Sequence, residues 1–273
     1  MRKICSICNM RHEQVKAKKH LGQHFLNDEQ IALNIVNGLM DKCTVNQVLE
    51  IGPGMGVLTK YLLKKPITLH AIDVDEESIT YLKQHYPDLT SRLILGDFLQ
   101  IKPSDLFNDE FAVIGNFPYN ISTQIVFKIL EHRHQIPIMA GMFQKEVAER
   151  ICSGPGSKEY GILSVLAQTY YDLEFLFTVP EHVFTPPPKV KSGVMRMVRK
   201  AEAPDINEKM LFKVVKAAFN QRRKKLRNAI SQFGVDDAIL QPSGFADKRA
   251  EQLSVNDFIA LTNLVITHGN NNN

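Results

Sequence analysis

The sequence predicts an α/β protein with a doubly wound, mostly parallel sheet and a small all-helical C-terminal domain. Strand-like and helix-like segments alternate over about 200 residues, which is typical of parallel strands joined by helices. After a polar stretch at 201–206 that is typical of a linker, only helical patterns occur. The chain has 273 residues, of which 44% are hydrophobic and 23% charged, so its length and composition suit a globular protein with two domains.

Each expected element follows from its local pattern. Asp28 can cap a first helix, because apolar residues recur at helical spacing from Ile31 to Met40. Strands are then expected at residues 48–51, 67–73, 92–95, 111–115 and 136–143. Helices are expected at 57–63, 76–85, 122–132 (with Ser122 as the cap), 145–152 and 161–170. An antiparallel pair at 173–179 and 190–198 completes the sheet, and helices at 208–219, 225–233 and 255–266 form the second domain.

The net charge of +4 is unevenly distributed. Residues 1–24, 187–200 and 216–227 carry +5, +5 and +6, so the rest of the chain carries −12. Basic stretches on an acidic body indicate a polyanionic partner, most simply nucleic acid, although solvated basic faces are the alternative. We expect a flexible basic arm at 1–18, a catalytic sheet domain at 19–200 and a helical substrate-recognition domain at 201–273.

The hydropathy and the cysteine pattern of the sequence bear on the cellular location of the protein and on metal binding. No apolar run is long enough for a membrane helix and the first residues lack a secretory core, so we expect a cytoplasmic protein. The four cysteines do not form a disulfide framework at this length. Cys5 and Cys8, with His12, are half of a zinc motif that lacks a second cysteine pair, so no metal is expected.

A glycine-rich turn, Gly52-Pro53-Gly54-Met55-Gly56, directly follows the first expected sheet strand. The third glycine comes too early for a dinucleotide site, and Pro53 lacks an N–H group that could hold a phosphate. Asp73, 21 residues after Gly52, is placed to bind a ribose, and Asp97 can accept from an adenine amino group with Phe98 beside the ring. Adenosine without phosphate, beside acids that favour a cation, fits S-adenosylmethionine. The alternative is a tight turn with no ligand.

A second motif, Asn116-Phe117-Pro118-Tyr119, follows the fourth strand of the expected sheet. In a doubly wound sheet this strand lies beside the first, so Asn116 should meet Gly52. An adenine amine is a poor nucleophile, but the Asn116 side-chain oxygen and the Phe117 carbonyl, held rigid by Pro118, can accept its hydrogens. Tyr119 offers a ring on which an extruded base can stack. The alternative is an ordinary Asn-Pro turn with Tyr119 in the core.

These motifs resemble those of the rRNA adenine N6,N6-dimethyltransferases. Residues 50–59 are similar to motif I of the class I, Rossmann-like methyltransferases, and 116–123 to their amino-methylating motif. The resemblance extends through 21–26, 144–150, 160–165, 183–190 and 218–228, and covers the chain from 18 to about 266. Residues 160–165 and 186–190 favour the small-subunit branch. A large-subunit methyltransferase of the antibiotic-resistance type and a non-catalytic ribosome-assembly factor are the alternatives.

The resemblance implies dimethylation of two adjacent adenosines in the 3′-terminal hairpin loop of small-subunit (16S) rRNA. The methyl donor would be S-adenosylmethionine, and the substrate a partly assembled 30S particle bound by a monomer. The implied catalytic residues are Asn116, Phe117, Pro118 and Tyr119. The implied cofactor contacts are Gln23, His24, Leu26, Glu50, Gly52, Gly54, Asp73, Asp97, Phe98 and Asn116. The implied RNA contacts are Tyr119, Phe184, Lys189, Arg222, Arg223, Lys224 and Arg227. The family commonly has Asn, Glu and Leu where this chain has His24, Asp73 and Phe117.

Overall fold

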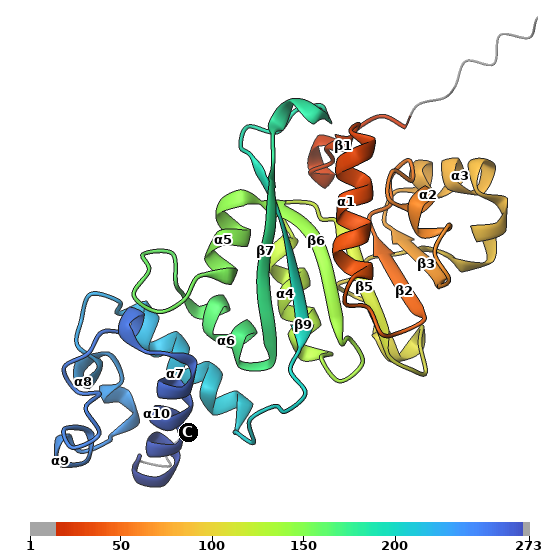
Figure 1. Cartoon of the computed structure of the whole chain (residues 1–273). Helices are drawn as coiled ribbons and strands as arrows, with labels where there is room; N and C mark the ends of the chain where they lie inside the picture. Colours follow the sequence, from red (N-terminus) through yellow and green to blue (C-terminus); the bar gives the residue numbers. More distant parts are fainter. Residues whose placement is uncertain (1–14, 270–273) are drawn as a thin grey trace, which may run out of the picture.

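The computed structural model describes residues 15–269, in which a central sheet carries helices and a group of C-terminal helices lies at one end (Figure 1). The sheet has seven strands in the order β4-β3-β2-β5-β6-β9-β7. Their bounds are β2 (Gln47–Ile51), β3 (Thr68–Asp73), β4 (Leu93–Leu95), β5 (Phe111–Asn116), β6 (Ile138–Gln144), β7 (Tyr171–Val179) and β9 (Ser192–Arg199). The first five strands in this order are parallel, and β9 and β7 pair antiparallel, which confirms the predicted mixed sheet.

Both faces of the sheet are buried, because neighbouring residues of one strand belong to different cores. Val48 packs with α1 (Glu29–Met40) and α2 (Thr59–Leu62) in one core. Leu49 belongs to the other core, which includes residues of α4 (Ser122–Glu131), α5 (Lys145–Cys152) and α6 (Ile162–Tyr170). This alternation is what a parallel sheet covered by helices on two sides requires.

The helices begin and end close to the predicted residues. The Asp28 side chain accepts the N–H of Ile31 at 2.9 Å and so caps α1, as expected. The bounds of α3 (Glu76–His85) and α5 match the prediction. Ser122 was expected to cap α4, but Ile121 occupies that position, and the Ser122 hydroxyl donates to the Tyr119 carbonyl at 3.1 Å. Short 3-10 turns are η1 (Lys19–Leu21), η2 (Pro87–Arg92), η3 (Pro103–Asp105), η4 (Glu181–Val183), η5 (Ser231–Phe233) and η6 (Ala250–Gln252).

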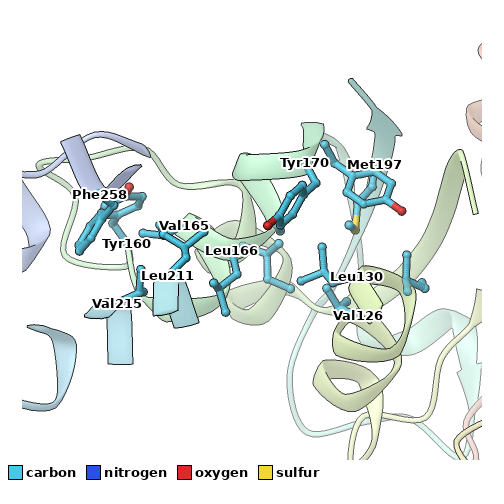
Figure 2. Close-up of a cluster of buried hydrophobic side chains, with 14 of the residues drawn as sticks. Val126, Leu130, Tyr160, Val165, Leu166, Tyr170, Met197, Leu211, Val215 and Phe258 are labelled. Atoms are coloured by element: carbon cyan, nitrogen blue, oxygen red, sulfur yellow. The ribbon is translucent and has the colours of Figure 1, made fainter. Parts of the chain in front are cut away.

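The C-terminal part contains α7 (Glu208–Asn220), α8 (Leu226–Ala229), α9 (Asp237–Leu240) and α10 (Val255–His268). The single helix expected at 225–233 is instead α8 followed by η5, which ends at Gly234 with φ +66°, and α9 was not expected. Leu166 of α6 and Leu211 of α7 lie in one continuous core, part of which is drawn in Figure 2. The helical part therefore packs directly on the sheet part.

A small antiparallel sheet that the sequence did not predict joins two distant segments. Strand β1 (Phe25–Leu26) pairs with β8 (Phe184–Thr185). The Asn27 N–H continues the pairing to the Val183 carbonyl at 2.8 Å. The N-terminal segment is thus held beside the loop that precedes β9. Within residues 15–269 no helix has the length and hydropathy needed to cross a membrane.

Candidate cofactor and target-base site

A cavity of about 200 Å³ lies where β2 and β5 end side by side. The predicted site residues that line it are Gln23, His24, Gly52, Gly54, Asp73, Asp97, Asn116, Phe117, Pro118 and Tyr119. Leu21, Phe25, Val74, Leu99 and Ile121 line it as well and were not predicted. The expected meeting of the glycine turn and the Asn116 motif at the switch point is therefore confirmed.

The glycine turn needs its glycines for conformation and for space. Gly52 and Gly54 have φ values of +68° and +55°, in the left-handed region that side chains disfavour. A Cβ atom on Gly54 would lie 2.9 Å from the Phe25 ring. The Phe25 ring therefore packs directly on Gly54, and the backbone of the turn borders the cavity.

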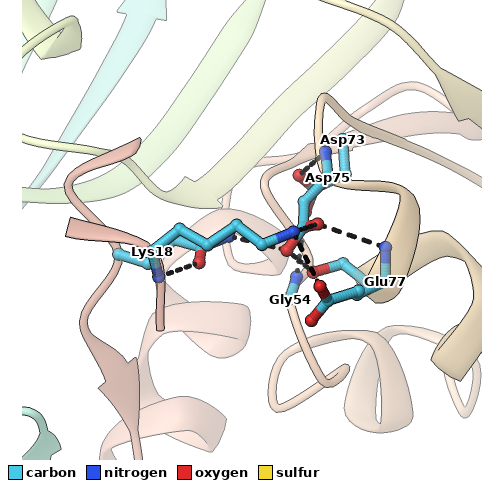
Figure 3. Close-up of polar contacts among 7 residues, drawn as sticks. Lys18, Gly54, Asp73, Asp75 and Glu77 are labelled. Atoms are coloured by element: carbon cyan, nitrogen blue, oxygen red, sulfur yellow. Dashed lines mark hydrogen bonds and ion pairs between the residues drawn. The ribbon is translucent and has the colours of Figure 1, made fainter. Parts of the chain in front are cut away.

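Asp73 is held by the backbone around it. Its Oδ1 accepts the Asp75 N–H at 2.9 Å and its Oδ2 accepts the Gly54 N–H at 3.3 Å (Figure 3). The residue is 6% exposed, and this burial raises its pKa. Each carboxylate oxygen accepts one hydrogen bond and keeps a further lone pair. The two oxygens together can therefore accept hydrogen bonds from the two hydroxyl groups of a vicinal diol such as that of a ribose.

Lys18 and Gln23 fasten the N-terminal segment to the start of α3. The Lys18 Nζ lies 2.5 Å from Asp75 Oδ1 and 3.1 Å from Glu77 Oε1 (Figure 3). Gln23 donates to Asp75 Oδ2 at 3.2 Å and accepts the Lys18 N–H at 2.8 Å. Burial raises the pKa of Asp75, but the bonds from Lys18 and Gln23 outweigh it and hold that pKa below its ordinary value. Lys18, which was expected to belong to the flexible arm at 1–18, therefore anchors the N-terminal segment to α3. Residues 1–14 of the expected arm lie outside the described residues.

Glu50 and Leu26 lie behind the glycine turn, where they line a small cavity of about 40 Å³. Glu50 is 1% exposed and accepts the Thr59 hydroxyl at 2.6 Å. Burial, with the nearby Asp73 charge, raises the pKa of Glu50 to about 8 despite that bond. Glu50 is therefore mostly neutral at physiological pH, and its side chain supports the turn through the bond from Thr59.

The Phe98 ring does not border the cavity, where it was expected to stand beside an adenine. Its side chain is 4% exposed and belongs to the core, with the Lys128 ammonium 5.8 Å from the ring centre. Leu99, the next residue, lines the cavity instead. The expectation that the Phe98 ring stands beside an adenine is corrected, because the turn after β4 points this side chain inward.

The Asn116 amide is oriented by a backbone group. Its Nδ2 donates to the His24 carbonyl at 2.9 Å, and Oδ1 has no hydrogen-bond donor within residues 15–269. Since an amide carries its acceptor opposite its donor, the oxygen is available as an acceptor at the cavity. Phe117 is buried, and its ring packs edge-on against Phe143 at 5.1 Å. Its side chain therefore belongs to the core, as expected for a residue that would act through its backbone.

A larger cavity of about 600 Å³ adjoins the first, and His24 and Tyr119 line both. Its other walls include the proline run 186–188 and Lys189. Phe184 was expected to face a target base here, but its side chain is 3% exposed and packs in the core with Leu26 and Val179. Phe184 lines neither of these two cavities.

The basic side chains that are predicted to bind RNA fall into two groups. Arg222 bonds to Glu251 at 3.3 Å and to the Ser157 carbonyl at 3.2 Å, and Arg227 pairs with Asp237 and Asp247. Arg223, Lys224 and Lys189 are exposed, with no acidic partner within 4 Å among the described residues. Acids from other segments thus already bind Arg222 and Arg227, and contact of these two residues with RNA phosphates stays a prediction. No cluster of three metal-binding side chains occurs within residues 15–269, and Cys5, Cys8 and His12 lie outside them.

The model of the family described as ribosomal RNA adenine dimethylase matches residues 14–267. The chain belongs to this adenine dimethylase family. Members of the family use S-adenosylmethionine, and the acids and bare backbone around the cavity fit the ribose and the cationic sulfur of that cofactor. The residues that would hold it are Gly52, Gly54, Asp73 and Asp97.

Relatives within the adenine dimethylase family are similar over nearly their whole length. The ribosomal RNA small subunit methyltransferase A of Cytophaga hutchinsonii is 59% identical and covers 93% of this chain and 98% of its own. The protein of the same name from Flavobacterium johnsoniae is 58% identical, with 94% and 98% covered. A dimethyladenosine transferase from Plasmodium falciparum has a TM-score of 0.77 at 25% identity and covers 89% of this chain and 97% of its own. The fold is that of a Rossmann-like methyltransferase.

Proposed function

We propose that this chain dimethylates N6 of two adjacent adenosines in the 3′-terminal hairpin loop of small-subunit (16S) rRNA. The observation that carries the proposal is the Asn116 amide, whose nitrogen is held by the His24 carbonyl at 2.9 Å and whose oxygen remains an acceptor at the cavity. The family and the names of the relatives support the same substrate.

The chemistry requires a nucleophile and an electrophile to be brought together in line. S-adenosylmethionine, when bound, supplies a methyl group on a positively charged sulfur. Asp73 and Asp97 line the cavity and favour that charge, and the Asp73 oxygens can accept from the ribose. Most of the rate enhancement then comes from positioning.

The target amine is prepared by acceptors of this chain. Asn116 Oδ1 accepts one hydrogen of the amine and the Phe117 carbonyl accepts the other, which leaves the nitrogen more pyramidal and electron-rich. Tyr119 supports the extruded base with its ring. Burial raises the pKa of Tyr119, so its hydroxyl stays protonated at neutral pH and is not the base. None is needed, since the methylated ammonium loses its proton to water readily.

The partner in this proposal is rRNA within a partly assembled small subunit in the cytoplasm, bound by a monomer. Three exposed basic side chains can contact phosphates on two sides of the target base. Lys189 lies beside the larger cavity, and Arg223 and Lys224 lie in the helical part. Such contacts fix position, whereas the shape of the RNA is read by the helical domain.

The proposal is tested with methyl-labelled S-adenosylmethionine and small subunits that lack these modifications. Wild-type protein should place label on two neighbouring adenosines near the 3′ end of the small-subunit rRNA, and Asn116→Ala should place almost none. Naked large-subunit rRNA is the comparison substrate. Label there but not in the small subunit, or equal label with Asn116→Ala, would overturn the proposal.

A further inference from the structure

His24 lies in the N-terminal segment 18–26, which we call the cofactor segment. At His24 this segment contacts the loop that borders the larger cavity. It directly precedes β1, and its side chain reaches Pro186, 162 residues further along the chain. His24 also lines both cavities, as do Gly22, Gln23 and Tyr119.

Three contacts of His24 converge on the groups that would hold the target base. Its carbonyl accepts the Asn116 amide at 2.9 Å. Its ring Nδ1 lies 2.7 Å from the Pro186 carbonyl, and because a carbonyl only accepts, Nδ1 is the donor. Its ring lies 5.6 Å from the Tyr119 ring, with 29° between the planes. One residue therefore contacts Asn116, Tyr119 and the proline loop.

We infer that His24 is a positioning residue for methyl transfer, and that its donor bond to Pro186 is the part of the side chain that matters. The bond holds His24 in place, and the backbone carbonyl of the same residue then fixes the Asn116 amide. This rests on the proposed function, in which the Asn116 oxygen must face the amine.

The physical reason is that an asparagine amide has two orientations of similar shape. With its nitrogen on the His24 carbonyl, Asn116 presents an oxygen to the target amine. If that carbonyl moves away, the amide can rotate and present its NH₂ group, which cannot accept a hydrogen from the amine. A displacement of His24 would thus lower the rate of methyl transfer even at saturating cofactor, because the acceptor for the amine is lost.

The ring and the donor can be tested separately. His24→Asn places an amide nitrogen near the position of Nδ1, so it keeps a donor but loses the ring. His24→Phe keeps a ring beside Tyr119 and has no donor. His182→Phe is the matched control, because His182 is exposed in η4, two residues before Phe184, and makes no side-chain hydrogen bond to the described residues.

The measurements are the single-turnover methylation rate on unmodified small subunits at saturating S-adenosylmethionine, and the Kd of S-adenosylhomocysteine. His24→Phe should lower the saturated rate about tenfold, the effect of one positioning hydrogen bond, and this loss should exceed any change in the Kd. His24→Asn should recover most of the rate, and His182→Phe should match wild type in both measurements.

The outcomes separate the possibilities. A wild-type rate with His24→Phe, or equally slow His24→Asn and His24→Phe, would overturn the inference, as would a weakened Kd with an unchanged saturated rate. If His24→Phe does not unfold cooperatively on heating, His24→Leu, which also lacks a donor, replaces it under the same criteria. A wild-type protein that transfers no label to small-subunit rRNA instead contradicts the proposed function itself.

Discussion

The hydroxyl groups of Tyr119 and Ser192 lie 2.5 Å apart, and this bond joins the loop after β5 to the first residue of β9. Ser192 is fully buried, so its position is fixed by the sheet. The Tyr119 ring is therefore held at both ends, by its backbone and by its hydroxyl, which gives a target base a fixed surface.

Tyr119→Ala should lower the methylation rate on small subunits about 10- to 100-fold, because base stacking on an aromatic ring is worth about 1–3 kcal/mol. Tyr119→Phe keeps the ring and loses only the bond to Ser192, so it should retain most of the activity. Single-turnover rates with labelled cofactor give the comparison. Equal activity of Tyr119→Ala and wild type would show that the ring does not support the base.

Asn116→Asp should lower the rate about 100-fold although the two side chains have almost the same shape. The substitution replaces the Nδ2 donor by an oxygen that faces the His24 carbonyl, and two acceptors repel one another. Cooperative thermal unfolding of the same protein controls for its folding. A rate within threefold of wild type would contradict the proposed orientation of the amide.

Lys18→Met should weaken cofactor binding several-fold, because Lys18 ties the segment that lines the cavity to Asp75 and Glu77. The dissociation constant should become less sensitive to salt in the variant, since an ion pair is lost. Lys42→Met, at an exposed position just after α1, serves as the control. Unchanged affinity and salt dependence in Lys18→Met would mean that the segment stays closed without this anchor.

The pH dependence of stability should reveal the buried Glu50. Its pKa is raised to about 8 in the folded protein from an ordinary value of 4.5, so the folded state binds a proton that the unfolded state has lost. Its contribution to stability is therefore complete below about pH 4.5 and declines as the pH rises to 8. At about 1.4 kcal/mol for each pKa unit, the decline should amount to several kcal/mol.

The Glu50→Gln variant isolates this effect. Gln keeps an acceptor for the Thr59 hydroxyl but does not titrate, so the free energy of unfolding in urea should fall less between pH 5.5 and 8 than in wild type. Parallel curves for the two proteins would show that Glu50 ionises with an ordinary pKa.

The two groups of basic residues should behave differently. Arg223→Ala with Lys224→Ala should weaken binding to small-subunit rRNA and lower the salt slope of the affinity by about 2, because two exposed charges are removed. Arg227→Ala should instead lower the thermal midpoint, since Arg227 pairs with Asp237 and Asp247. Binding at varied salt and thermal unfolding of both variants test this. A large salt effect of Arg227→Ala without loss of stability would reverse the assignment.

Local patterns explain why so much of the sheet and the switch point could be predicted. The Asp28 cap, the buried run of β2 and the turn at Gly52 are each encoded within a few residues. The pairing of β1 with β8 could not be predicted in this way, because two-residue strands have no period and these lie far apart in sequence. The side-chain directions of Phe98 and Phe184, and the acids that pair with Arg222 and Arg227, likewise depend on the tertiary structure.

The pairing of β1 with β8 also has a consequence for the order in which the chain folds. Phe25 leaves the ribosome early in synthesis, but Thr185, its partner, emerges 160 residues later. Closing so long a loop carries a large entropic cost before any contact offsets it, so the pair forms only after the intervening sheet has folded. A nascent or truncated chain that ends before β8 would have the glycine turn and Asn116 but an open cofactor segment. We therefore expect no methyl transfer from a chain that ends before β8.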